Sequence, residues 1–154
     1  MDSPIPSGWR IWFATLDPLV ALSGAFANAF STSTVLSSYN PQAIEPPAIE
    51  TTIVLNMSTG FLLGTLFLQV VLLRLRSRDL TVWRCLQASI AIVDLVIIAS
   101  VLQGLSIQGR ITPALWRWQE WGNLLITGFV LATRVVFLLV VHPTQLGDSR
   151  AKWD

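Results

Sequence analysis

Four apolar stretches of about 20 residues each dominate this 154-residue chain and limit what it can fold into. They cover about residues 9–30, 52–75, 83–105 and 118–141. A helix of about 20 residues crosses the roughly 30 Å hydrocarbon core of a bilayer. Backbone groups in lipid must bond to one another, and continuous apolarity without alternation favours helices over a barrel. The sequence therefore predicts an all-α fold, a four-helix transmembrane bundle formed by one membrane domain over residues 1–154.

The composition excludes several classes of protein. Charged residues make up 12% of the chain, against about 25% in soluble domains. The formal net charge is only +1, so we expect no nucleic-acid partner. Cys85 is the only cysteine and His142 the only histidine, and neither a glycine-rich phosphate loop nor an acidic pair for diphosphate is present. We therefore expect no metal site and no cofactor.

The basic residues are distributed unequally between the two ends of the predicted helices. In a four-span chain both termini and the second link share one side, which carries seven basic residues against two on the other. Positive residues concentrate on the cytosolic side of membrane proteins. Both termini are therefore predicted to be cytosolic, in a multi-pass protein that we expect in the endoplasmic reticulum. The seven are Arg10, Arg74, Arg76, Arg78, Arg84, Arg150 and Lys152; the two are Arg110 and Arg117.

Each predicted helix carries a strongly polar group at membrane depth. Counting about 1.5 Å per residue from the cytosolic ends places Asp17, Gln69 and Arg134 near one level. Asp94 then lies deeper, near the midplane, with no basic residue at its own level. Charges inside a bilayer are costly and usually face a bundle interior or a wet cavity. We therefore expect Asp17 to pair with Arg134, and Asp94 to be protonated or hydrated.

Some of these residues also have purely structural interpretations. Asp17 followed by Pro18 is the pattern of an N-cap before a new helix, which predicts a kinked or broken first helix at Asp17. Glu120 can simply lie at the lumenal interface. Gly60 and Gly64 form a GxxxG motif, which indicates tight packing inside the monomer first and a homo-oligomer second. His142 is interpreted as a boundary residue and not as a catalyst.

Residues 11–139 resemble a family of small, mostly uncharacterised fungal membrane proteins. The matching segments are LDPLVALSGAFANAF (16–30), LNMSTGFLL (55–63), RDLTVWRCLQASIAIVDL (78–95) and WQEWGN (118–123). Trp83-Arg84 with Asp94, and Trp121 with Asn123, lie at positions typical of that family. Many relatives carry a histidine after the aspartate; this chain has none, so any role of that histidine is lost.

The resemblance implies a function in fungal secondary metabolism. Some relatives in those pathways are thought to open epoxides on polyene or terpenoid intermediates, using water or internal hydroxyls. Such a reaction needs an acid for the leaving oxygen and a base for the nucleophile. We therefore hypothesise a cofactor-independent epoxide hydrolase or cyclase for a hydrophobic polyketide or terpenoid, with Asp94 as the acid, Asp17 as the base and Glu120 as a third candidate.

The remaining polar and aromatic groups are candidates for substrate binding. Amide side chains can position a water or a substrate oxygen, and tryptophan faces can stabilise developing positive charge. The candidate substrate-binding residues are Asn56, Gln69, Asn123, Arg134, Trp116 and Trp121.

The alternative is a non-catalytic lipid-binding or scaffold protein of a biosynthetic pathway. Its basis is the arginine cluster of residues 74–84, which is suited to anionic lipid. A scaffold would scatter or pair its polar groups. An enzyme should leave at least two carboxyls facing one cavity.

Overall fold

The computed structural model describes residues 5–141; His142, Arg150 and Lys152 lie outside this range. The described residues contain no strand, and four helices are long and apolar enough to span a membrane: Ser7–Phe30, Ile49–Leu75, Leu80–Ile107 and Trp118–Val140. The predicted all-α membrane bundle is confirmed, and every helix begins and ends close to its predicted bound.

The long helices form two hairpins. The first spanning helix comprises α1 (Ser7–Ile11), a π-helical turn (Trp12–Leu16) and α2 (Asp17–Phe30). It packs against the second, formed by α4 (Ile49–Phe67), a π-helical turn (Leu68–Leu72) and α5 (Leu73–Leu75). The other hairpin pairs α6 (Leu80–Ile107) with α7 (Trp118–Val140). A short helix, α3 (Thr32–Tyr39), and a 3-10 turn, Pro113–Leu115, lie in the links at the far end.

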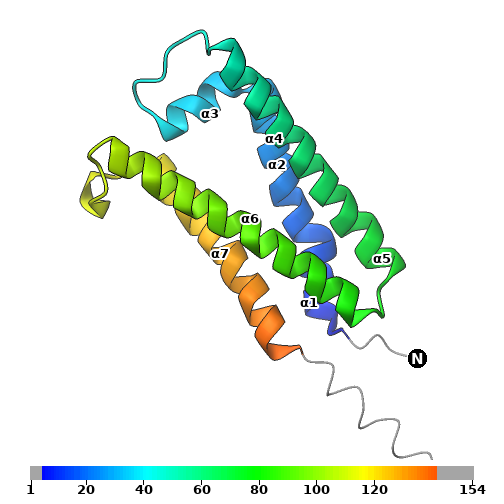
Figure 1. Cartoon of the computed structure of the whole chain (residues 1–154). Coiled ribbons are helices and arrows are strands. Elements are labelled where there is room, and N and C mark those ends of the chain that lie inside the picture. Colours follow the sequence, from blue (N-terminus) through cyan, green and yellow to red (C-terminus); the bar gives the residue numbers. More distant parts are fainter. Residues whose placement is uncertain (1–4, 142–154) are drawn as a thin grey trace, which may run out of the picture.

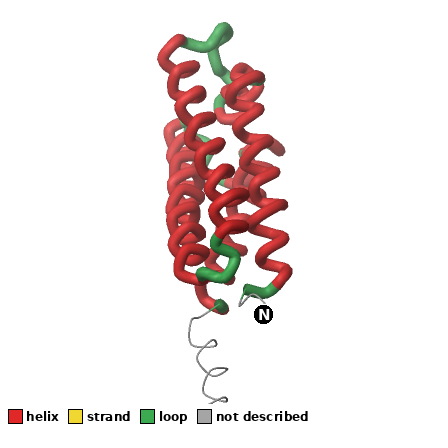
Figure 2. The backbone as a smooth tube through the Cα atoms, turned by 90° about the vertical axis from the view of Figure 1, so that its right-hand side faces the viewer, coloured by secondary structure: helices red, strands yellow, loops and turns green. Residues whose placement is uncertain are grey.

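The hairpins converge at the end that carries the described chain termini and diverge toward α3 (Figure 1). The view turned by 90° shows the long helices running side by side along one axis (Figure 2). At the converging end an apolar cluster joins both hairpins, and it places the rings of Phe13 and Phe137 5.2 Å apart. The cluster consists of Ile5, Phe13, Leu73, Leu80, Trp83, Phe137 and Val141.

The first helix, predicted to be kinked or broken at Asp17, is not broken there, but a π-helical turn interrupts its α-helical geometry directly before Asp17. It runs continuously from Ser7 to Phe30, and the Asp17 side chain caps no helix. Pro18 has no N–H for the carbonyl of Ala14, four residues earlier. The π-helical turn accommodates this missing hydrogen bond, and the guanidinium of Arg74 donates to the Ala14 oxygen over 3.2 Å. The proline therefore frees a carbonyl, which Arg74 satisfies.

Gly60 and Gly64 do not pack inside the monomer, so the first interpretation of the GxxxG motif is wrong. Both glycines are exposed, and a side chain added at either position would meet no atom within 4 Å. The face of α4 toward α2 instead carries Thr59, whose hydroxyl donates to Ala25 O (3.5 Å), and Leu62, which approaches Gly24. The homo-oligomer stays a prediction.

The arrangement leads to a specific topology experiment. The described ends of the chain and the 76–79 loop lie at one end of the bundle, and the link after α3 lies at the other (Figure 1). We expect tags at both termini to be cytosolic and a reporter inserted at Asn40 to be lumenal, because basic residues favour the cytosolic side. Protease protection of sealed microsomes measures this, with a reporter at Ser77 as the cytosolic control. Digestion of the Asn40 reporter together with both termini would contradict the four-span topology.

Candidate buried ion cluster

A buried cluster of charged and amide side chains lies where the hairpins converge, next to the apolar cluster. Arg134 of α7 is its centre and is 3% exposed. Its Nη1 and Nη2 atoms donate to Asp17 Oδ2 (2.8 Å) and Oδ1 (3.0 Å), a bidentate pair with α2. Its Nε atom donates to Asp94 Oδ2 of α6 over 2.8 Å. One guanidinium therefore bridges two carboxyl groups from different hairpins, and we call Asp17, Arg134 and Asp94 the Asp–Arg–Asp bridge.

Two glutamines complete the cluster. Gln69 donates to Asp17 Oδ2, and Gln87 accepts from Arg134 Nη1 over 2.8 Å. The Nε2 atom of Gln87 is buried and has no partner among the described residues. Since unpaired buried donors are costly, this amide is suited to an oxygen atom of water or a ligand.

The two π-helical turns explain why Asp17 and Gln69 meet. Asp17 follows one turn directly and Gln69 lies within the other, and the two turns contact each other. A π-helical turn inserts an extra residue into a helix and rotates the residues that come after it, and such turns are frequent at functional sites. Here the rotation brings a carboxyl and an amide together from adjacent helices.

The predicted contact between Asp17 and Arg134 is confirmed, whereas the predicted isolation of Asp94 is wrong. The depth count started at Trp83 and at Val141, and the structure keeps these two points near one level, because Arg84 donates to the carbonyls of Leu138 (2.7 Å) and Val141 (2.5 Å). The count left Asp94 only about four residues, or about 6 Å, deeper than Arg134. The long arginine side chain covers the remaining difference between Arg134 and Asp94.

Asp94 is the most accessible member of the Asp–Arg–Asp bridge. Its side chain keeps 10% of its surface exposed, against 4% for both Asp17 and Arg134. Asp17 accepts three hydrogen bonds, whereas Asp94 accepts one, at Oδ2. A molecule that approached the bridge would therefore meet the Oδ1 atom of Asp94 first.

Glu120 lies in a separate cluster at the diverging end. Arg110 donates to both of its carboxylate oxygens (2.8 and 2.7 Å), and the backbone N–H and the guanidinium of Arg117 donate as well. These bonds close the first turn of α7. They also raise the pKa of the Arg110 guanidinium, because the hydrogen bonds to Glu120 favour its charged form. Glu120 is therefore fully engaged, about 20 Å along α7 from Arg134.

The other candidate residues are also remote from the Asp–Arg–Asp bridge. Asn123 donates to the hydroxyl of Tyr39 over 3.0 Å, and Trp116 and Trp121 contact each other with ring centroids 4.8 Å apart. Asn56 is exposed on α4. The aromatic ring at the bridge is that of Phe13, 5.9 Å from Arg134 Cζ.

Sequence reasoning missed Gln87 and Phe13. Gln87 precedes Asp94 by seven residues, a spacing that places both on one helix face. That spacing could have identified the glutamine. Phe13 carries no such signal, because an aromatic residue in an apolar helix is ordinary.

A pocket of about 410 Å³ lies toward the diverging end, and its lining begins at Val96, two residues beyond Asp94. We call it the α6 groove. Its lining runs along α6 from Val96 to Gln108 and includes Tyr39 at the end of α3, the following Asn40, and Glu120. Asp94, Ile97 and Val101 are spaced three and four residues apart, so they share one face of α6. The groove therefore continues the face of α6 that carries Asp94. Among residues 5–141 no group of three potential metal-binding side chains comes together.

Four spanning helices around a buried ion cluster define a multi-pass membrane protein. The chain belongs to the family described as a domain of unknown function, DUF7704, which matches residues 2–143. No curated protein and no solved structure matches the chain.

Proposed function

We propose that this protein is a membrane-embedded epoxide hydrolase or cyclase for hydrophobic polyketide or terpenoid intermediates of fungal secondary metabolism, in the endoplasmic reticulum. The observation that carries the proposal is the Asp–Arg–Asp bridge, in which one guanidinium holds two carboxyl groups. Acid-assisted epoxide opening needs a proton donor and a proton acceptor at the same substrate.

Charge balance indicates which carboxyl is the proton donor and which is the acceptor. One guanidinium neutralises one carboxylate, and a second ionised carboxylate would be a buried, uncompensated charge. A single proton shared by the two carboxyls removes that charge. Donors engage both carboxyl oxygens of Asp17, which accepts three hydrogen bonds, whereas Asp94 accepts one and keeps Oδ1 for the proton. Asp94 is therefore the acid and Asp17 the base.

The reaction uses both carboxyls. Asp94 gives its proton to the epoxide oxygen as the carbon–oxygen bond breaks. A water, or a hydroxyl of the substrate, forms the new bond at that carbon and loses its proton to Asp17. The product is a vicinal diol or a cyclic ether, and proton return from Asp17 to Asp94 through water restores the starting state. Gln69 and Gln87 are placed to hold the attacking or leaving oxygen.

Isotope labelling tests this proposal. Microsomes that contain the protein are given epoxidised polyenes and terpenoids in ¹⁸O-labelled water, and the products are analysed by mass spectrometry. We expect a diol with one labelled oxygen for hydrolysis, or an unlabelled cyclic ether for cyclisation. Microsomes with Glu50→Gln, an exposed carboxyl on α4, should behave as the wild type. Absence of both products across the series, with the protein folded and inserted, would contradict an epoxide-opening activity.

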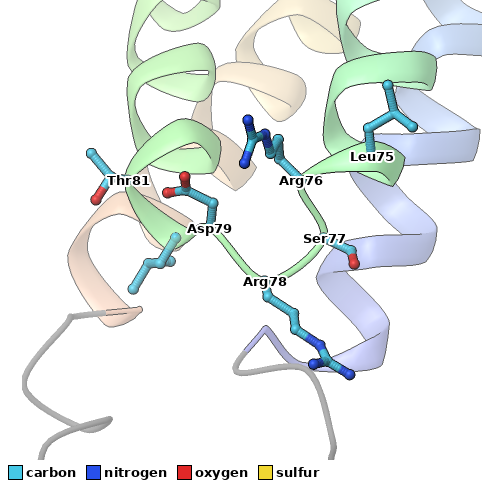
Figure 3. A pocket seen from close by; sticks show the side chains of 7 residues that line it. Leu75, Arg76, Ser77, Arg78, Asp79 and Thr81 are labelled. Atoms are coloured by element: carbon cyan, nitrogen blue, oxygen red, sulfur yellow. The ribbon is translucent and has the colours of Figure 1, made fainter.

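A second candidate is the non-catalytic lipid-binding or scaffold protein. Two observations favour it. All three carboxyls, Asp17, Asp94 and Glu120, pair with arginines. The loop between α5 and α6 forms a hollow of about 700 Å³ in which Arg76 and Arg78 point to opposite sides (Figure 3). Such a loop is suited to anionic headgroups. The two candidates differ in their dependence on Asp94. If the Asp94→Asn protein supports the pathway as well as the Glu50→Gln control does, the scaffold candidate is favoured.

A further inference from the structure

The α6 groove is elongated. Its lining from Val96 to Gln108 covers about 18 Å of helix at about 1.5 Å per residue, and its volume is about 410 Å³. Because the lining follows one helix over about three turns, a ligand that fills the groove lies along α6 and is itself elongated.

The two ends of the groove are polar, and its middle is mostly apolar. At the inner end lies the face of α6 that carries Asp94. At the outer end Tyr39 keeps a hydroxyl proton to donate, because Asn123 donates to its oxygen (3.0 Å). The Oδ1 atom of Asn123 is buried without a partner among the described residues. These groups complement an oxygen function on a ligand, about 21 Å along α6 from Asp94.

The outer end is also held in a defined position. Arg117 donates to the carbonyls of Ser37 and Ser38 (both 2.9 Å), and Gln108 donates to the carbonyl of Tyr39 (3.0 Å). These bonds attach the end of α3 to the α6–α7 hairpin, where the hairpins otherwise diverge (Figure 1). Hydrogen bonds between α3 and the α6–α7 hairpin therefore hold the oxygen-binding end in place.

We propose that the α6 groove binds one linear, unsaturated chain that carries an oxygen function at each end. The distal hydroxyl or carbonyl binds at Tyr39 and Asn123, and the near end reaches Asp94. That the near end is an epoxide rests on the proposed function; the binding of the chain does not. The groove thus favours elongated, doubly oxygenated substrates, and the distance between its two polar ends sets the length of chain accepted.

Gly104 provides a selective way to block the groove. It lines the groove, and a Cβ atom there would meet no atom within 4 Å, so Gly104→Phe adds a ring to the groove wall from a position with room for its first atom. Gly64 on the outer face of α4 is equally open and lies outside the groove. Gly64→Phe is therefore the matched control for a phenylalanine added on a membrane helix.

Photolabelling measures binding without requiring turnover. The probe is a long-chain, ω-hydroxylated alkenyl alcohol with a mid-chain diazirine, added to purified full-length protein in detergent, and labelled peptides are located by mass spectrometry. We expect labelling within Val96–Gln108 for the wild type and Gly64→Phe, and about a tenfold loss for Gly104→Phe. A short alcohol of half the groove length should compete weakly in all three proteins.

The possible outcomes test binding in the groove and epoxide opening independently of each other. Equal labelling of Gly104→Phe and Gly64→Phe, or labelling mainly on α4, would overturn the groove as the binding site. Labelling of the groove in a protein that opens no epoxide would retain the groove and reject the proposed reaction. Epoxide opening whose chain-length preference is unchanged by Gly104→Phe would retain the reaction and reject the groove. Size-exclusion profiles of the three proteins check that each is folded.

Discussion

Asp94→Asn is expected to lower the rate of epoxide opening by about two to four orders of magnitude, which is the usual contribution of one general acid. The amide keeps the size of the carboxyl and its hydrogen bond from Arg134 Nε, but it cannot give an acidic proton to the leaving oxygen. The protein should nevertheless fold, because Asp17 alone neutralises Arg134. Turnover is measured in microsomes, and folding by the melting temperature in detergent.

The control for this substitution is Glu50→Gln, which changes an exposed carboxyl to an amide at the start of α4. It should leave both turnover and melting temperature unchanged. Full activity in a folded Asp94→Asn protein would show that Asp94 is not the acid, and it would favour the scaffold function.

Arg134→Gln is expected to destabilise the protein by about 3–5 kcal/mol, the usual effect of removing one partner of a buried ion pair. Arg134 joins both hairpins, and its loss leaves Asp17 and Asp94 without a cation at positions that are 3% and 7% exposed. Unfolding of the purified protein in mixed micelles measures the change, with Arg10→Gln, an exposed arginine, as the control.

Neutralising the carboxyls should rescue this variant. Combining Arg134→Gln with Asp17→Asn and Asp94→Asn removes the uncompensated charges, and replacement of a whole buried ion network is often nearly neutral for stability. We expect the triple variant to recover most of the lost stability and none of the activity. If the Arg134→Gln protein is as stable as the wild type, this contradicts the Asp–Arg–Asp bridge.

The sequence alone was enough to predict the class of fold. Crossing a bilayer requires a run of apolar residues of fixed length, and that requirement can be assessed along a single segment. The four helices and the position of both described ends at one end of the bundle therefore agree with the pattern in the chain. The contact between Asp17 and Arg134 was also predictable, because two opposite charges near one depth neutralise each other.

Relations between helices were less predictable. The interpretation of Gly60 and Gly64 was wrong because a small-residue motif does not specify which face of its helix meets a neighbour; here the face toward α2 carries Thr59 and Leu62. The Asp17-Pro18 pair predicted a kinked or broken helix. A π-helical turn lies just before Asp17, Arg74 satisfies the freed carbonyl, and the helix continues. Arg74 lies 60 residues away from Ala14 in the chain, so no local pattern shows this contact.

The composition of each segment determined that this chain enters a membrane as four helices, because burial of apolar surface in lipid depends on the segment alone. Only the tertiary structure decided that Asp94 shares Arg134 with Asp17. That contact depends on the rotation of the helices by two π-helical turns, on the alignment of α6 with α7 that Arg84 fixes, and on the reach of an arginine side chain. These quantities arise from packing between segments, and they convert an apparently isolated carboxyl into one half of a carboxyl pair that shares a single guanidinium.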